Sequence, residues 1–342
     1  MNSCKNCGSK IQFTPKEKGN KCASCGSVFP IEYNYGFFKK PFSANVNLKV
    51  DNFAKSIKSL RCSSCGATMV LNKLETQSSC PYCGNTSVIE GRKNKLMYID
   101  SIIPFNFSKD EALKQFKSTL VSKFYADKAV FKGITTENIS GIYVNAFVFD
   151  FIANASYSGV FSYTETTKDK DGNTQWKTVH KSVSGIYNNN FENITVEANS
   201  HINQDELRSI MPVDYRAAVD FKEDFMNGYL LEYEDKMFND CVNTAELLVK
   251  KRIESDLLRK HNCDRIVSLT LNINYIDKKY NYCLLPVYLV TNVYKNTKYT
   301  SLINGQTGKI GKLPTSVGKI LLTIFLILGV VAGFIVLGLF AF

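Results

Sequence analysis

Eight cysteines near the N-terminus have the residue type and the spacing of metal ligands. They form four Cys-x-x-Cys pairs, each followed directly by glycine, and in both halves of the pattern fourteen residues separate one pair from the next. The first set is Cys4, Cys7, Cys22 and Cys25, and the second set is Cys62, Cys65, Cys80 and Cys83. Two thiolates three residues apart grip a metal ion from one side, and two such turns complete a tetrahedral site. We therefore predict two Cys4 zinc ribbons, each formed by neighbouring pairs.

The glycines that follow the cysteine pairs favour a turn whose backbone conformation a Cβ would hinder. Iron in a rubredoxin-like site is the main alternative metal, crossed pairing of the turns is an alternative arrangement, and a disulfide framework is an alternative chemistry. Disulfides need an oxidising compartment, and the N-terminal residues do not resemble a secretion signal. Four thiolates fill the coordination sphere, so we expect two structural Zn²⁺ ions and no metal-bound substrate.

The last 23 residues, Ile320 to Phe342, contain no charged side chain and predict a transmembrane helix. Lys309, Lys312 and Lys319 precede it and no basic residue follows it, so the positive-inside rule predicts a tail-anchored protein of the cell membrane, single-pass, with the bulk of the chain cytoplasmic. Gly329 and Gly333 have the small-xxx-small spacing that allows two helices to approach closely, which points to a homo-oligomer.

The formal net charge of +11 is concentrated in the ribbon region, because residues 1–95 contribute +10 and the remainder contributes +1. Two filled Cys4 sites would lower the charge of residues 1–95 to about +6. Such a surface suits anionic membrane lipid or nucleic acid. Residues 33–61 interleave aromatic and lysine side chains, as single-strand binding platforms do, although packing of these aromatics on the ribbons or on the next domain is the favoured interpretation.

The elements that position these ligands follow from periodicity and turn residues. We expect a strand over 96–107, a helix from the capping box Ser108–Glu111 to about residue 126, and strands over 141–163 and 174–187 around the turn Lys168–Asn173. Residues 205–233 look mostly helical, and a longer helix over 236–261 carries an apolar stripe of period three to four. Strands over 266–276, 282–294 and 298–303 then lead into a turn at Asn304–Lys309. That turn does not fit a phosphate-binding loop, because Ile303 stands where the first glycine belongs.

The predicted fold class is α+β, with two N-terminal Cys4 zinc ribbons, a central domain with an antiparallel sheet, and one C-terminal transmembrane helix. The expected domains are ribbon 1 (1–32), an aromatic and basic linker (33–61), ribbon 2 (62–95), the α+β domain (96–314) and a juxtamembrane segment with the transmembrane helix (315–342).

No catalytic constellation is evident in the sequence. The three histidines, His180, His201 and His261, fall in separate elements, and the remaining cysteines are isolated. The acidic run Glu232–Asp235 is interpreted as a solvated face. We therefore expect a protein that is not an enzyme.

Several motifs together resemble a family of bacterial tail-anchored membrane proteins with transcription-factor-IIB-type zinc ribbons. They are the Cys-x-x-Cys-Gly turns, Leu284–Val290, Asn304–Lys309, Leu313-Pro314 and the hydrophobic segment that follows. Genes of this family lie near those of flotillin-like and phage-shock-type membrane-stress proteins, which implies such proteins as partners. The resemblance implies a non-enzymatic membrane-anchored adaptor that recruits cytoplasmic proteins to the membrane in a membrane-stress response. The alternative is a membrane-tethered nucleic-acid-binding zinc-ribbon protein.

Overall fold

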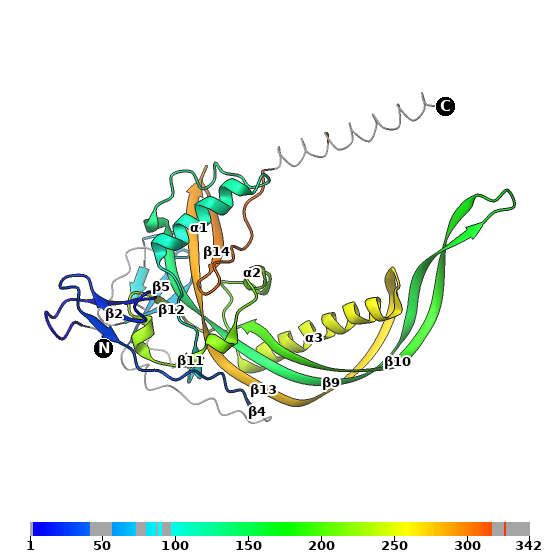
Figure 1. The fold of residues 1–342 in the computed structure, drawn as a ribbon, viewed down its shortest axis with the longest axis horizontal. Coiled ribbons are helices and arrows are strands. Elements are labelled where there is room, and N and C mark those ends of the chain that lie inside the picture. The colour runs from blue at the N-terminus through cyan, green and yellow to red at the C-terminus, as the bar shows by residue number, and fades with distance from the viewer. Residues whose placement is uncertain are drawn as a thin grey trace.

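A computed structural model describes residues 3–41, 57–72, 80–86, 88–90 and 97–316, together with Phe325. The molecule is elongated, with a small N-terminal sheet at one end and a curved arm of long strands that reaches out at the other end (Figure 1). The small sheet has the order β1 (Ile11–Thr14), β2 (Gly19–Cys22) and β3 (Val28–Pro30), with antiparallel neighbours. This sheet, with the loops around it, forms ribbon 1.

A large sheet forms the rest of the described structure. Along its main path the strand order is β11-β8-β13-β9-β12-β6-β5-β7, and β10, β14 and β4 pair with β9, β13 and β13 respectively. The bounds of its strands are β4 (Lys40–Pro41), β5 (Ile57–Cys62), β6 (Thr68–Asn72), β7 (Val88–Glu90), β8 (Ser101–Ile102), β9 (Ile139–Lys168), β10 (Thr174–Glu197), β11 (Val219–Asp220), β12 (Leu230–Glu232), β13 (Arg265–Tyr294) and β14 (Thr297–Asn304).

The arm is built on β9, which pairs with β10 on one side and with β13 on the other. The first half of β9 is buried on both faces, the next residues alternate between buried and exposed, and the last residues are exposed. This progression follows the strand out of the core and into solvent, because alternation has period two where only one face is covered. The tip is the predicted turn Lys168–Asn173, where Gly172 has a φ of +82°.

The helices cover the sheet. They are α1 (Lys109–Ser122), α2 (Gln204–Ser209) and α3 (Phe238–His261), and short 3₁₀ turns lie at η2 (Thr136–Asn138), η3 (Tyr215–Ala217) and η4 (Glu223–Met226). The capping box at α1 is confirmed, since Ser108 and Glu111 exchange side-chain and backbone hydrogen bonds. The predicted apolar stripe of α3 is also confirmed: Phe238, Val242, Ala245, Val249, Ile253 and Leu257 are buried. This stripe contributes to the main hydrophobic core together with β9 and β10.

The predicted fold class is wrong, because the described structure is mostly β and its large sheet is mixed. β12 runs parallel to β9, and β8 runs parallel to β13. Both short strands have only two or three residues, too few to show a period in the sequence, so their pairing is set by packing.

Two segments also differ locally from the prediction. Residues 205–233 are not mostly helical, since α2 ends at Ser209 and 3₁₀ turns and short strands follow. Pro212 has no amide to donate and keeps the residue before it out of the helical region, which accounts for the early end. The strand expected over 96–107 is limited to β8.

The prediction of a tail-anchored, single-pass membrane protein is corrected by the structure. A spanning helix needs about 20 consecutive apolar residues. No helix within the described ranges is long and apolar enough to cross a membrane. The longest of them, α3, carries acidic and basic side chains along its length. Apart from Phe325, the predicted segment 320–342 lies outside the described residues, as do Gly329 and Gly333.

Candidate metal centres

The sulfur atoms of the first cysteine set converge on one point in ribbon 1. Cys4 and Cys22 are buried, whereas Cys7 and Cys25 are exposed. The Sγ–Sγ distances are 3.5 Å for Cys4 and Cys25 and 3.5 Å for Cys7 and Cys22, and all four atoms lie within 4.8 Å of one another. Four sulfurs around Zn²⁺ at a bond length of about 2.3 Å would be about 3.8 Å apart. The cluster is therefore positioned to hold a metal ion.

The second set converges in the same way. Its Sγ–Sγ distances are 3.4 Å for Cys62 and Cys83 and 3.7 Å for Cys65 and Cys80, and the four sulfurs again lie within 4.8 Å of one another. These distances are far longer than the roughly 2.05 Å of a disulfide bond. The predicted pairing of neighbouring turns is correct, because each cluster takes its ligands from two successive Cys-x-x-Cys pairs.

The same backbone hydrogen-bond pattern positions the ligands in all four turns. The glycine amide donates to the carbonyl of the first cysteine at 2.8 or 2.9 Å, and the amide of that cysteine donates to the residue five positions later at 2.7–2.9 Å. The glycines Gly8, Gly26, Gly66 and Gly84 have φ values between +72° and +78°. The expectation that these positions favour glycine is therefore confirmed, and the turns place the two thiols of each pair on the same side of the cluster.

The environment of the first cluster makes some of its thiols more acidic than others. The hydroxyl and the amide of Ser27 donate to Cys25, which lowers the pKa of that thiol to about 6. Burial raises the pKa of Cys4 to about 11. A divalent ion binds thiolates and must displace the remaining protons, so metal affinity of this cluster rises with pH.

Ribbon 1 is attached to the main domain through a few apolar contacts. Phe13 is buried, lies 5.2 Å from the ring of Phe225, and its amide donates to the carbonyl of Asn227 at 2.9 Å. The first cluster itself belongs to a separate small core with Ile11 and Phe29. Ribbon 1 therefore has its own small core around the cysteine cluster and is connected to the domain at its edge.

Ribbon 2 is built into the large sheet. Its strands β5 and β6 continue the sheet through the pairing of Leu231 with Val70, and Cys62 and Cys80 share a core cluster with residues of β9 and β13. The hydroxyl of Thr291 donates to the carbonyl of Pro81 at 2.9 Å, so the turn between Cys80 and Cys83 also contacts β13. The second cysteine cluster is therefore part of the packing of the main domain.

A buried carboxyl network lies beneath ribbon 2, where the sequence analysis expected a solvated face. That interpretation of Glu232–Asp235 is wrong for Glu232 and Glu234, which are 0% and 8% exposed. The hydroxyl of Tyr82, which lies between two cysteine ligands, donates to Glu232 at 2.5 Å. Burial raises the pKa of Glu232 to about 8 and that of Glu234 to about 7. The sequence did contain a signal of this burial, because Glu232 and Glu234 alternate directly after the apolar pair Leu230-Leu231, as residues on one face of a strand do.

The linker after ribbon 1 packs on the main domain, as favoured from the sequence. Phe37 stacks on Tyr215 with ring centroids 4.7 Å apart. The amine of Lys39 contacts Asp150 at 2.5 Å, and Lys40 contacts Asp100 at 2.7 Å. These cations are therefore engaged within the protein. Residues 42–56 of the linker lie outside the described residues.

The three histidines and the turn Asn304–Lys309 lie apart from one another and form no common site. His180, His201 and His261 lie on β10, before α2 and at the end of α3, and His201 and His261 contact Tyr82 and Tyr157 respectively. Asn304–Lys309 is a turn, since the Asn304 side chain accepts from the amides of Gln306 and Thr307.

Comparisons with known proteins give one similar sequence. An uncharacterized protein of Bacillus subtilis (strain 168), YdjG, is 25% identical to this chain over 325 residues, which span 93% of the chain and 91% of the relative. No family model matches the chain, and no solved structure matches it. Membership of the zinc-ribbon family that the sequence resembles therefore stays a prediction.

Proposed function

We propose that this protein is a non-enzymatic adaptor, in which two structural Zn²⁺ ions hold the ribbons and different surfaces bind different partner proteins. The two Cys4 clusters support zinc, because four thiolates in a tetrahedral arrangement are the typical donor set of closed structural sites. Such a site has no open position for a substrate. In this proposal the ions contribute folding free energy and do no chemistry.

The observation that carries the proposal is the separation of two projecting parts. Ribbon 1 lies at one end of the molecule and the tip of the β9–β10 hairpin lies at the other, with the main core between them (Figure 1). Both parts are anchored in that core. Ribbon 1 is anchored by Phe13, and the hairpin is anchored by the buried residues of β9 and β10. A molecule with two distant projecting ends suits a protein that brings partners together.

Both ends present apolar side chains to solvent. Val28 of ribbon 1 is 40% exposed, and Trp176 near the hairpin tip is 75% exposed. Trp176 is the only tryptophan in the sequence. Tryptophan is enriched among the residues that contribute most to protein–protein binding. Proteins of the flotillin-like and phage-shock types, which the family resemblance implies, are the partners to test first.

The test is affinity capture. The purified full-length chain serves as bait in a lysate of its source organism, and the bound proteins are identified. The variants are Val28→Ser at ribbon 1 and Trp176→Ala at the hairpin. Val121→Ser on α1 is the matched control, because Val121 is 66% exposed and belongs to neither end. We expect each end variant to lose a different set of proteins and the control to lose none.

Two results would contradict the adaptor proposal. One is an unchanged set of captured proteins in both end variants. The other is a set of captured proteins that nuclease treatment releases, which would instead favour the nucleic-acid-binding alternative. The fluorescence of Trp176 supplies a second readout, because docking of a partner on the hairpin should shift the emission of an exposed tryptophan to shorter wavelength.

A further inference from the structure

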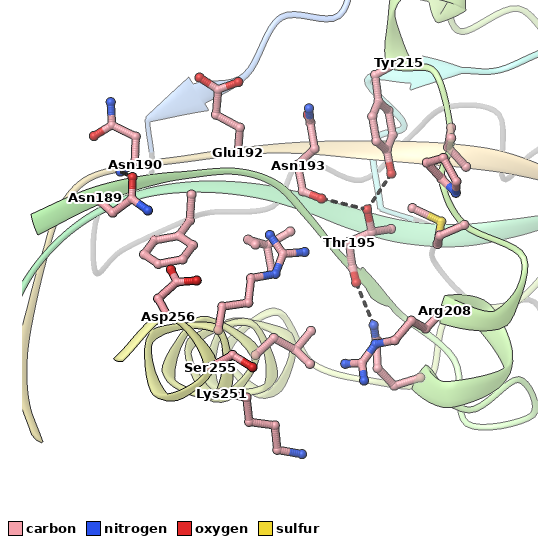
Figure 2. A pocket seen from close by; sticks show the side chains of 18 of the residues that line it. Asn189, Asn190, Glu192, Asn193, Thr195, Arg208, Tyr215, Lys251, Ser255 and Asp256 are labelled. Carbon is pink, nitrogen blue, oxygen red and sulfur yellow. Dashed lines mark hydrogen bonds between the residues drawn. The ribbon is translucent and has the colours of Figure 1, made fainter. Parts of the chain in front are cut away.

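A cavity of about 910 Å³ lies between β10, α3 and the segment that contains α2 and the loop after it. Figure 2 shows side chains from all three walls around it, among them Asn190 of β10, Arg208 of α2 and Lys251 of α3. Its volume lies within the range of small-molecule sites, about 300–1,000 Å³. The cavity is far from both metal centres in sequence and shares no residue with them.

Basic side chains dominate the charge of this cavity. Its lining contains four cations, Arg208, Lys251, Arg252 and Arg259, and two anions, Glu192 and Asp256. Asp256 is already engaged, since it accepts hydrogen bonds from Tyr187 at 2.5 Å and from Arg259. The formal charge of the lining is therefore +2, because the pair Asp256–Arg259 cancels and Glu192 offsets only one of the three other cations.

The two arginines on opposite walls lack strong partners of their own. Arg208 reaches Asp205 only at 3.7 Å, in an exposed pair within α2. The side chain of Arg252 makes no hydrogen bond and no ion pair within 4 Å among the described residues, although Asp256 lies one turn further along α3. Burial lowers the pKa of Arg252, and the nearby charge of Arg208 lowers it further. Both arginines are exposed to solvent, so an anion can reach them from outside and would offset their mutual repulsion.

We propose that this cavity binds a small molecule that carries a phosphate monoester, with the phosphate between Arg208 and Arg252. A phosphate monoester carries a charge of about −1.5 to −2 at pH 7, which matches the +2 of the lining better than a single carboxylate does. Guanidinium groups bind phosphate oxygens through two parallel hydrogen bonds, so one arginine from each wall can hold the group.

The rest of the ligand would lie against the mixed remainder of the cavity. Met211, Val213 and Leu248 supply apolar surface, and Asn189 and Asn190 supply amide groups for hydroxyls or other polar atoms. This distribution suits a compact polar molecule such as a sugar phosphate. The proposal does not depend on the adaptor function, because no residue of the cavity belongs to ribbon 1 or to the hairpin tip.

The test is calorimetric titration of the purified zinc-loaded chain with inorganic phosphate, glucose 6-phosphate, glucose and succinate. We expect saturable binding of the two phosphate compounds and none of glucose. Arg208→Gln and Arg252→Gln should each weaken binding at least about tenfold, and Arg252→Lys should weaken it less, because lysine keeps the charge and loses the paired geometry. Two separate variants keep the test decisive if one of them folds poorly.

Arg216→Gln is the matched control. Arg216 has the same charge, follows the loop of the cavity, is 91% exposed at its side chain and pairs with Asp214 outside the lining. Its replacement should change affinity less than about twofold. The proposal is overturned if neither phosphate compound binds saturably up to about 10 mM, if succinate binds as tightly as glucose 6-phosphate, or if Arg216→Gln weakens binding as much as the cavity variants.

Discussion

Replacing Glu232 by glutamine is expected to stabilise the protein increasingly as the pH rises from 6 to 8. Glu232 is fully buried, and although Tyr82 donates to its Oε1, its Oε2 has no hydrogen-bond partner among the described residues. Burial is the largest cause of the raised pKa of about 8, the Tyr82 hydrogen bond lowers it in part, and the charges of Asp235 and Glu197 raise it. A filled metal site next to Tyr82 carries a net charge of −2, which acts in the same direction.

The sign and size follow from proton linkage. The unfolded chain ionises Glu232 near pH 4.5, while the folded protein keeps it protonated up to about pH 8. Between these values the unfolded state binds fewer protons, so the wild-type protein loses about 1.4 kcal/mol of stability for each pH unit from this group. Glutamine does not ionise and is free of that loss. Because the group is half ionised at pH 8, we expect the difference in unfolding free energy between Glu232→Gln and wild type to grow by about 2 kcal/mol from pH 6 to pH 8.

Urea denaturation at pH 6, 7 and 8 with saturating zinc measures this difference. Tighter zinc binding at higher pH affects both proteins alike and cancels when the two are compared at the same pH. Glu165→Gln on the hairpin is the control, because Glu165 pairs with Lys181 in an exposed setting and its replacement should change stability by less than about 0.5 kcal/mol at any pH. Parallel pH curves for Glu232→Gln and wild type would refute the reasoning.

Three further predictions concern the ribbons and the helices. Cys80→Ser should weaken hydrogen-exchange protection across the main sheet, because ribbon 2 shares the core of that sheet. Cys22→Ser should weaken protection in ribbon 1 alone, because ribbon 1 has a separate core. Loss of protection over the same residues in both variants would contradict this difference between the two ribbons. Ile253→Ala in the buried stripe of α3 should cost about 2–5 kcal/mol of unfolding free energy in urea, against less than about 0.5 kcal/mol for the 59% exposed Leu247→Ala, and similar costs would mean that the stripe is not core. Ser108→Ala should lower stability by about 1 kcal/mol in thermal melts, and no change would argue against the capping box.

Features with a local physical signature could be predicted from the sequence. The cysteine turns depend on ligand spacing and on glycine, the capping box depends on Ser108 and Glu111, and the stripe of α3 depends on helical periodicity. The hairpin tip was also predictable, because Lys168–Asn173 combines turn residues between two runs of strand formers. Each of these signals lies within a few residues of the element that it specifies.

Features set by tertiary contacts were not predictable in this way. The parallel pairings of β8 and β12 involve strands of two or three residues, and the burial of Glu232 depends on Tyr82, which is 150 residues away in the sequence. β13 was expected as two strands, over 266–276 and 282–294. The structure instead continues the strand through a bulge at Asp277, whose φ is +47°.

The cavity lined by arginines shows the same limit. Arg208 lies in a segment that the sequence predicts only as mostly helical, Arg252 lies on the helix with the apolar stripe, and neither residue has a motif around it. Their charges become informative only when α2 and α3 are placed on opposite walls of one cavity.

Elemental analysis of the purified chain tests the central claim most directly. If both Cys4 clusters hold structural zinc, the full chain should contain two zinc atoms per molecule, and Cys22→Ser and Cys80→Ser should each contain one. Bound iron in place of zinc, or a metal-free protein whose cysteines are oxidised to disulfides, would contradict the account.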